Sequence, residues 1–151
     1  GTIWPVIFEF WNGLTLAANY ADAAEDERKI YLAEMEEARR WFAVLAENCP
    51  ENYLCQSLML SAELERITGH DLSALELYER AINYAEQTNS IQYQALANEL
   101  CARFYLGRRQ KKIAAAFLAE ARTCYAQWGA AAKVEELNLR LSVSSPTVRK
   151  G

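Results

Sequence analysis

The segment from residue 58 to residue 128 carries one pattern twice, offset by forty residues. The apolar positions of the two copies coincide in pairs: Leu60 with Leu100, Ala62 with Ala102, Ala74 with Ala114, and Ala81 with Ala121. Charged positions do not coincide, since Arg80 falls on Glu120, where packing does not constrain the residue. A period of about 40 residues is typical of stacked helix pairs, each burying its apolar face against its neighbours. The repeat therefore predicts an all-α chain built as an α-solenoid.

Apolar spacing and turn residues together predict seven helices and no strands. The helices are expected at about 3–21, 25–47, 51–68, 72–88, 91–107, 110–128 and 130–142. Asn89 and Gly129 should take the left-handed conformation that ends a helix, and Gly69 should end the third helix. We expect three antiparallel pairs and a seventh helix whose Val134, Leu137 and Leu141 cap the stack. Residues 1–142 would form one helical-repeat domain, and the serine-rich, basic residues 143–151 a linker or tail.

The first two helices carry distinct apolar patterns. The first is rich in aromatic residues, which are Trp4, Phe8, Phe10 and Trp11. They are either core or an interface left open when the chain was cut from a larger protein, and the second reading predicts weak self-association through this helix. The second helix should bury a stripe made of Ile30, Tyr31, Met35, Ala38, Phe42 and Leu45. Spacing of four residues predicts two ion pairs, Glu36 with Arg40 in this helix and Glu99 with Arg103 in the fifth helix.

Composition excludes several functional classes. No apolar run reaches the ~18 residues that span a bilayer, so no membrane partner is expected. The four cysteines form no C-x-x-C pair and the single histidine is His70, so we expect no metal, redox pair or cofactor. Four thiols placed as small buried groups favour a reducing compartment, the cytoplasm. His70 lies in a turn without a nucleophile or second base, so no catalytic activity is expected.

Two regions are candidate partner-binding surfaces. In a solenoid the first helix of each pair lines a concave face, which would present Glu65, Arg66, Asn98 and Tyr105. The alternatives are that Asn98 satisfies a neighbouring turn and that Tyr105 is core. The second region is a basic cluster, formed by Arg103, Arg108, Arg109, Lys111 and Lys112. Its lysines oppose the dipole of the helix they begin, so helix stability does not explain them.

The distribution of charge along the chain helps to choose between possible partners of the basic cluster. Residues 1–102 carry 17 acids and 6 bases, a net of −11, whereas residues 103–151 carry 10 bases and 3 acids, a net of +7. Such asymmetry favours contact with a charged protein surface. Binding of nucleic acid or phosphate at 103–112 is the alternative, but the pI of about 5.1 is far below that of most DNA-binding domains. A solvated loop is the third reading.

Four sequence strings carry a resemblance to a known family. They are residues 47–52 (ENCPEN), 77–82 (LYERAI), 95–106 (ALANELCARFYL) and 128–134 (WGAAAKV). Together they resemble the helical-repeat region of very large bacterial signalling proteins, and the likeness runs from about Phe8 to Leu141. Those proteins join a serine/threonine kinase-like domain, a STAND-type AAA ATPase, this helical region, a GAF domain and often a histidine kinase.

The helix pairs themselves, with Ala74, Tyr78 and Ala81 after a glycine turn, resemble tetratricopeptide (TPR) repeats, although the period exceeds the usual ~34 residues. The resemblance implies a right-handed solenoid of TPR-like hairpins. It also implies a non-catalytic scaffold for contacts with other proteins or neighbouring domains, because phosphate-loop and kinase motifs are absent from the chain. No ligand residues are carried over from the family.

Overall fold

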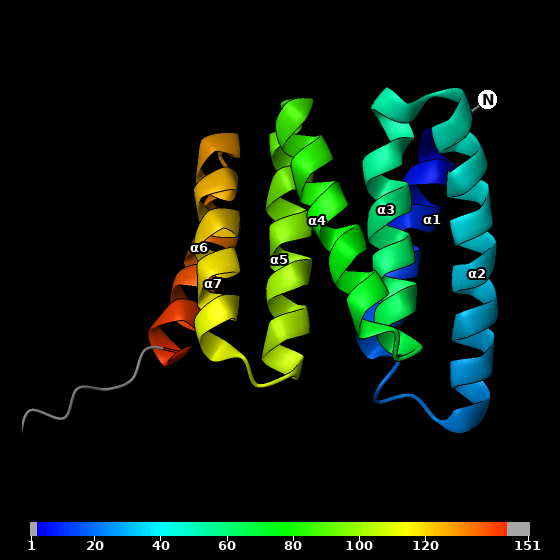
Figure 1. The fold of residues 1–151 in the computed structure, drawn as a ribbon, viewed down its shortest axis with the longest axis horizontal. Helices are drawn as coiled ribbons and strands as arrows, with labels where there is room; N and C mark the ends of the chain where they lie inside the picture. Colours follow the sequence, from blue (N-terminus) through cyan, green and yellow to red (C-terminus); the bar gives the residue numbers. More distant parts are fainter. Residues whose placement is uncertain (1–2, 145–151) are drawn as a thin grey trace, which may run out of the picture. The chain divides into compact units, whose positions relative to one another are not determined.

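The computed structural model describes residues 3–144. This part of the chain forms seven α-helices and no strands (Figure 1): α1 (Ile3–Asn19), α2 (Glu25–Asn48), α3 (Pro50–Ile67), α4 (Asp71–Gln87), α5 (Ile91–Gly107), α6 (Lys111–Trp128) and α7 (Ala131–Ser144). The all-α class and the number of helices are confirmed, and most ends agree with the predicted ones within two residues. The tail from residue 145 and the side chain of Trp4 lie outside the described residues.

The chain packs as two compact units, Gly1–Ala81 and Ile82–Gly151, and the boundary falls inside α4. In the first unit α3 is the most enclosed helix, with every residue from Cys55 to Leu60 buried. Gly13 allows α1 to approach α3 closely, since a Cβ at this position would lie 2.6 Å from the Leu60 Cδ2 atom. Phe10 is core, because it is buried and its ring lies 6.0 Å from that of Phe42 in α2.

Two predictions for α2 are wrong in detail. Ile30 is 58% exposed, and the buried face of the helix runs through Met35, Ala38, Phe42 and Ala46. Five residues separate Ile30 from Met35, which places them about 140° apart around a helix of 3.6 residues per turn. Glu36 pairs with Arg39 at 2.8 Å rather than with Arg40. Both spacings bring a glutamate within reach of a base, so spacing alone does not choose between them.

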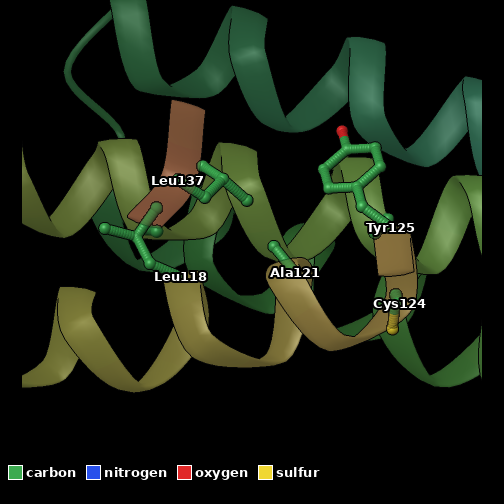
Figure 2. Packing of buried hydrophobic residues seen from close by; sticks show 7 residues of the cluster. Leu118, Ala121, Cys124, Tyr125 and Leu137 are labelled. Carbon is green, nitrogen blue, oxygen red and sulfur yellow. The ribbon is translucent and has the colours of Figure 1, made fainter. Parts of the chain in front are cut away.

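In the second unit α5 is the most enclosed helix, and α6 and α7 complete the core. Leu118, Ala121, Cys124 and Tyr125 of α6 gather with Leu137 of α7 in one apolar cluster (Figure 2). Val134 and Leu141 pack against this cluster, so the predicted stripe of α7 is confirmed. The alanines of the forty-residue repeat, Ala74, Ala81, Ala114 and Ala121, are completely buried.

One helix-ending turn occurs four times, at intervals of twenty residues. Positive φ angles occur at Gly69 (86°), Asn89 (54°), Arg109 (60°) and Gly129 (85°). The backbone N–H of the residue after each of these four donates to the carbonyl oxygen five residues before it. The N···O distance is 2.8 Å for His70 and 2.9 Å for Ser90, Gln110 and Ala130. This is the Schellman arrangement, which satisfies carbonyl groups left open at a helix end. The left-handed conformations of Asn89 and Gly129 are confirmed, and that of Arg109 was not foreseen.

Replacing either of two glycines near these turns by alanine should change the stability in opposite directions. Gly129→Ala should lower the free energy of unfolding by about 1–2 kcal/mol, because a side chain at φ 85° is strained. Gly107→Ala should instead raise it by up to about 1 kcal/mol, because this residue belongs to α5 and its Cβ would meet nothing within 4 Å. Urea denaturation followed by circular dichroism measures both. Equal effects of the two variants would contradict the turn geometry.

The buried alanines lead to a second prediction. Ala81→Leu and Ala121→Leu should each lower the free energy of unfolding by about 1–3 kcal/mol, because a larger side chain overpacks a filled core. Ala119→Leu is the control, since Ala119 is exposed on the same helix as Ala121. Thermal denaturation of the three variants tests the packing, and an unchanged transition for both buried positions would show that these sites have space.

Candidate protein-interaction surfaces

Glu65 and Arg66, predicted as partner-binding residues, lie near the end of α3 in the first unit. The Arg66 guanidinium donates to Glu63 at 2.8 Å and to the carbonyl oxygen of Ala17, at the end of α1, at 3.1 Å. The Glu65 carboxylate lies 3.3 Å from the His70 Nδ1 atom. Arg66 therefore ties α3 to α1, whereas Glu65 is only half-buried beside the following turn.

Asn98 and Tyr105, the other predicted concave residues, belong to α5 in the second unit. Asn98 is buried and donates to the Gln94 carbonyl oxygen at 2.9 Å. The Tyr105 ring stacks on Phe117 of α6, with ring centroids 5.6 Å apart and planes 14° from parallel. Both side chains take part in the packing of the second unit, and their binding role stays a prediction.

The basic cluster divides into engaged and open side chains. Arg103 bonds to Glu99 at 2.6 Å, and the Arg108 guanidinium lies 4.1 Å from the centroid of the Phe104 ring. Arg109, Lys111 and Lys112 are exposed and make no hydrogen bond or ion pair within residues 3–144. These three form the part of the cluster that is open to an anionic partner.

Glu99 of α5 is a buried carboxylate at the centre of the second unit. It is 1% exposed and receives three donors: Arg103 at 2.6 Å, Lys133 of α7 at 2.9 Å and the Tyr125 hydroxyl of α6 at 2.9 Å. Burial alone would raise the pKa of Glu99. The hydrogen bond from Lys133 and the charges of Arg103 and Lys133 outweigh it, so the pKa is lowered from its ordinary value. Glu99 is therefore ionised at neutral pH.

The network continues along α7. Lys133 also bonds to Glu136 at 3.3 Å, and Glu136 accepts from Arg140 at 2.9 Å. Burial and the neighbouring Glu99 raise the pKa of Tyr125, so its hydroxyl stays a donor. Sequence analysis identified the Glu99–Arg103 pair, which is confirmed, but missed Tyr125 and Lys133. The available signal was a glutamate placed among apolar residues on a helix without a polar face.

The first unit holds a similar arrangement around Glu63 of α3, which sequence analysis also missed. Glu63 is 4% exposed and accepts a short hydrogen bond from the Tyr78 hydroxyl of α4, besides that from Arg66. Burial, followed by the charge of Glu63, raises the pKa of Tyr78 and keeps its hydroxyl protonated. In both units a carboxylate is enclosed and satisfied by neighbouring side chains. Such a group holds helices in register rather than meeting a ligand.

A groove between α1 and α2 forms the remaining candidate surface. It encloses about 640 Å³ and is lined by aromatic, acidic and small residues: Phe8, Glu9, Asn12, Glu34, Glu37, Ala38 and Trp41. Of the aromatic residues singled out in the first helix, Phe8 is 64% and Trp11 50% exposed, whereas Phe10 is core. The groove therefore combines open aromatic rings with carboxylates, and none of the described residues that line it is basic.

The Glu99 network predicts a pH-dependent contribution to stability. The pKa of Glu99 is lower in the folded state than in the unfolded state, where it is about 4.3. The contribution of Glu99 to the free energy of unfolding is therefore present above this unfolded pKa and is lost as the pH falls through the folded pKa. Near pH 7, Glu99→Gln should therefore lower the free energy of unfolding by about 1–3 kcal/mol, with the difference shrinking below pH 4. Glu135→Gln on the exposed side of α7 is the control. A difference that is the same at pH 7 and pH 3, measured by urea denaturation, would contradict an ionised Glu99.

Within the described helices, none is both long and apolar enough to cross a membrane. No group of three or more histidine, cysteine or acidic side chains in this part of the chain is arranged to hold a metal ion. The four cysteines form no disulfide: Cys55, Cys101 and Cys124 are buried and Cys49 is half-buried. Burial raises the pKa of the Cys55 thiol to about 12.

Comparison with known proteins gives a narrow result. No family model matches the chain, and no solved structure matches it. A stretch of 55 residues is 44% identical to part of "Hybrid signal transduction histidine kinase G" from Dictyostelium discoideum. The match covers 36% of this chain and 2% of that protein, so the chain spans only a small fraction of this relative. The similarity indicates a signal-transduction context.

Proposed function

We propose that this chain is a non-catalytic helical-repeat scaffold that holds protein partners or neighbouring domains together within a large signal-transduction protein. The observation that carries the proposal is the repeated helix-ending turn, at residues 69, 89, 109 and 129, combined with similarity to a signalling histidine kinase. Regular antiparallel helix pairs are the building unit of α-solenoids, whose large surfaces bind other proteins.

The proposal also covers the arrangement of the helices. We infer a right-handed solenoid of TPR-like hairpins over residues 1–142, with α7 as its capping helix and residues 143–151 as a linker. The twenty-residue interval between turns supports it, because helices of nearly equal length can stack along their whole length. The bacterial origin and the neighbouring ATPase and GAF domains rest on the sequence resemblance alone. Three buried cysteines that form no disulfide support a cytoplasmic location.

The chemistry of the interior supports a scaffold over an enzyme. An active-site acid or base needs access to a substrate and a pKa suited to proton transfer. Glu63 and Glu99 are instead enclosed, and their oxygens are occupied by arginine, lysine and tyrosine donors. Both carboxylates are explained by packing without a reaction.

A second candidate function is binding of nucleic acid or phosphate through residues 103–112. The open side chains of Arg109, Lys111 and Lys112 favour it. The net charge of the chain, −4, favours a protein partner instead, because an acidic molecule repels a polyanion at long range.

A pull-down experiment separates these functions. The purified chain is immobilised and offered the ATPase and GAF domains that the resemblance places beside it, and in parallel a DNA duplex and a single-stranded RNA. We expect at least one domain to be retained at micromolar affinity, in the usual range of transient interdomain contacts. Retention of nucleic acid alone, abolished by Lys111→Gln with Lys112→Gln, would support the second function and contradict the scaffold.

A further inference from the structure

The groove between α1 and α2 exposes apolar and acidic side chains whose presence is not explained by the packing of the first unit. Among the side chains that the structure describes on these two helices, six large apolar ones are exposed: Ile7, Phe8, Trp11, Ile30, Trp41 and Val44. Scattered apolar residues are normal on a protein surface, but neighbouring ones indicate an interaction site. Two of the six, Phe8 and Trp41, line a cavity of about 640 Å³.

Helical spacing aligns these side chains with the acidic ones. Ile30, Glu34, Glu37, Trp41 and Val44 follow one another at intervals of four, three, four and three residues, which places them in one stripe along α2. Phe8 and Trp11 are three residues apart on α1 and share a face in the same way. The stripe on α2 covers fifteen residues, from Ile30 to Val44, a length of about 21 Å.

The carboxylates of the groove lack cationic neighbours. Within residues 3–144, Glu9 and Glu37 make no hydrogen bond or ion pair, and Glu34 receives only a 3.5 Å contact from the Asn12 amide. The unit that contains the groove carries 15 acids and 6 bases, a net of −9. This contrasts with Glu63 and Glu99, each of which is occupied by bases from the same unit.

The exposed aromatic rings and the carboxylates of the groove together favour one class of binding partner. A purely apolar segment would remove the three carboxylates from water without replacing their hydration. A symmetric second copy would place the same glutamates opposite each other, since such an interface uses one patch twice. A guanidinium group stacks on aromatic rings and donates two parallel hydrogen bonds to a carboxylate, so it matches both features of the groove.

On this basis, and resting on the proposed scaffold function, we propose that the α1–α2 groove binds an arginine-bearing amphipathic helix of a partner protein. The arginines lie between the Phe8 and Trp41 rings and pair with Glu34 and Glu37. The apolar residues of the partner helix cover Val44 and the exposed face of α1. Arginine is preferred over lysine, because an ammonium group neither stacks nor bonds in a bidentate manner.

Peptide binding measured by isothermal titration calorimetry tests this. The probe is a synthetic helical peptide of about 15 residues, the length of the stripe, with arginines four residues apart and a leucine flank. Three peptides of the same sequence carry lysine, citrulline or glutamate in place of arginine. We expect the arginine peptide to bind, the lysine peptide to bind several-fold more weakly, and the other two not to bind. Binding should weaken about tenfold or more between low and high salt.

Variants of the chain supply the matched controls. Glu34→Gln with Glu37→Gln should weaken binding of the arginine peptide about tenfold or more, because it removes charge-assisted hydrogen bonds. Glu76→Gln with Glu79→Gln removes the same charge from an exposed pair with the same spacing on α4, and should change the affinity less than about twofold. Circular dichroism establishes that both double variants are folded.

Three outcomes would overturn the inference. If the two double variants bound the arginine peptide equally well, its arginines would lie elsewhere on the protein. If the citrulline peptide bound as tightly as the arginine peptide, the groove would be an apolar site. A dimer in light scattering that Trp11→Glu converts to monomer would identify a second copy as the occupant. The scaffold function is judged separately: if any of these outcomes is found and a neighbouring domain is still retained in the pull-down, the scaffold stands and the groove inference fails.

Discussion

The left-handed turn repeated at Gly69, Asn89, Arg109 and Gly129 is the constraint on which the rest of the structure depends. Each turn ends one helix, satisfies its last carbonyl groups and lets the next helix begin within two residues. Because the turns are twenty residues apart, the helices between them have nearly equal lengths. Apolar stripes can then face each other along a whole helix. The conformation is kept even at Arg109, where the side chain disfavours it, so the surrounding packing holds the turn.

The two buried glutamates have a geometric role within this frame. Glu63 is satisfied by Tyr78 and Arg66, and Glu99 by Tyr125, Lys133 and Arg103. A buried ion pair contributes little net stability compared with apolar packing, but leaving it unpaired is costly. Tyr78 of α4 and Tyr125 of α6 each donate to a carboxylate on another helix, so a shift of the tyrosine-bearing helix along its neighbour would leave that carboxylate without this donor. Glu34 and Glu37 of the α1–α2 groove differ in both respects, since they are exposed and make no ion pair within residues 3–144.

Local signals made much of the fold predictable. The predicted bounds of the fifth helix, 91–107, are those of α5, and the left-handed residues Asn89 and Gly129 were identified from residue type and repeat register. The Glu99–Arg103 pair followed from its spacing alone. These features depend on residues within one or two helical turns of each other. Ile30 shows the limit of such reasoning: it fits a helical stripe on its own, but α2 turns a different face to the core. The predicted binding residues show it too, because Arg66 bonds to Ala17 and Tyr105 stacks on Phe117, contacts that no local pattern indicates.

The sequence by itself determined the all-α class, the seven helices, the places where they end and the four buried alanines of the repeat. The physical reason is that propensity, capping and apolar period act over a few residues. Only the tertiary structure decided which charged groups are buried and which are open. Glu63 and Glu37 are both glutamates on amphipathic helices, yet α4 covers the first and the α1–α2 groove exposes the second. Whether a carboxylate meets a base depends on which helix packs over it, and that is a property of residues distant in the chain.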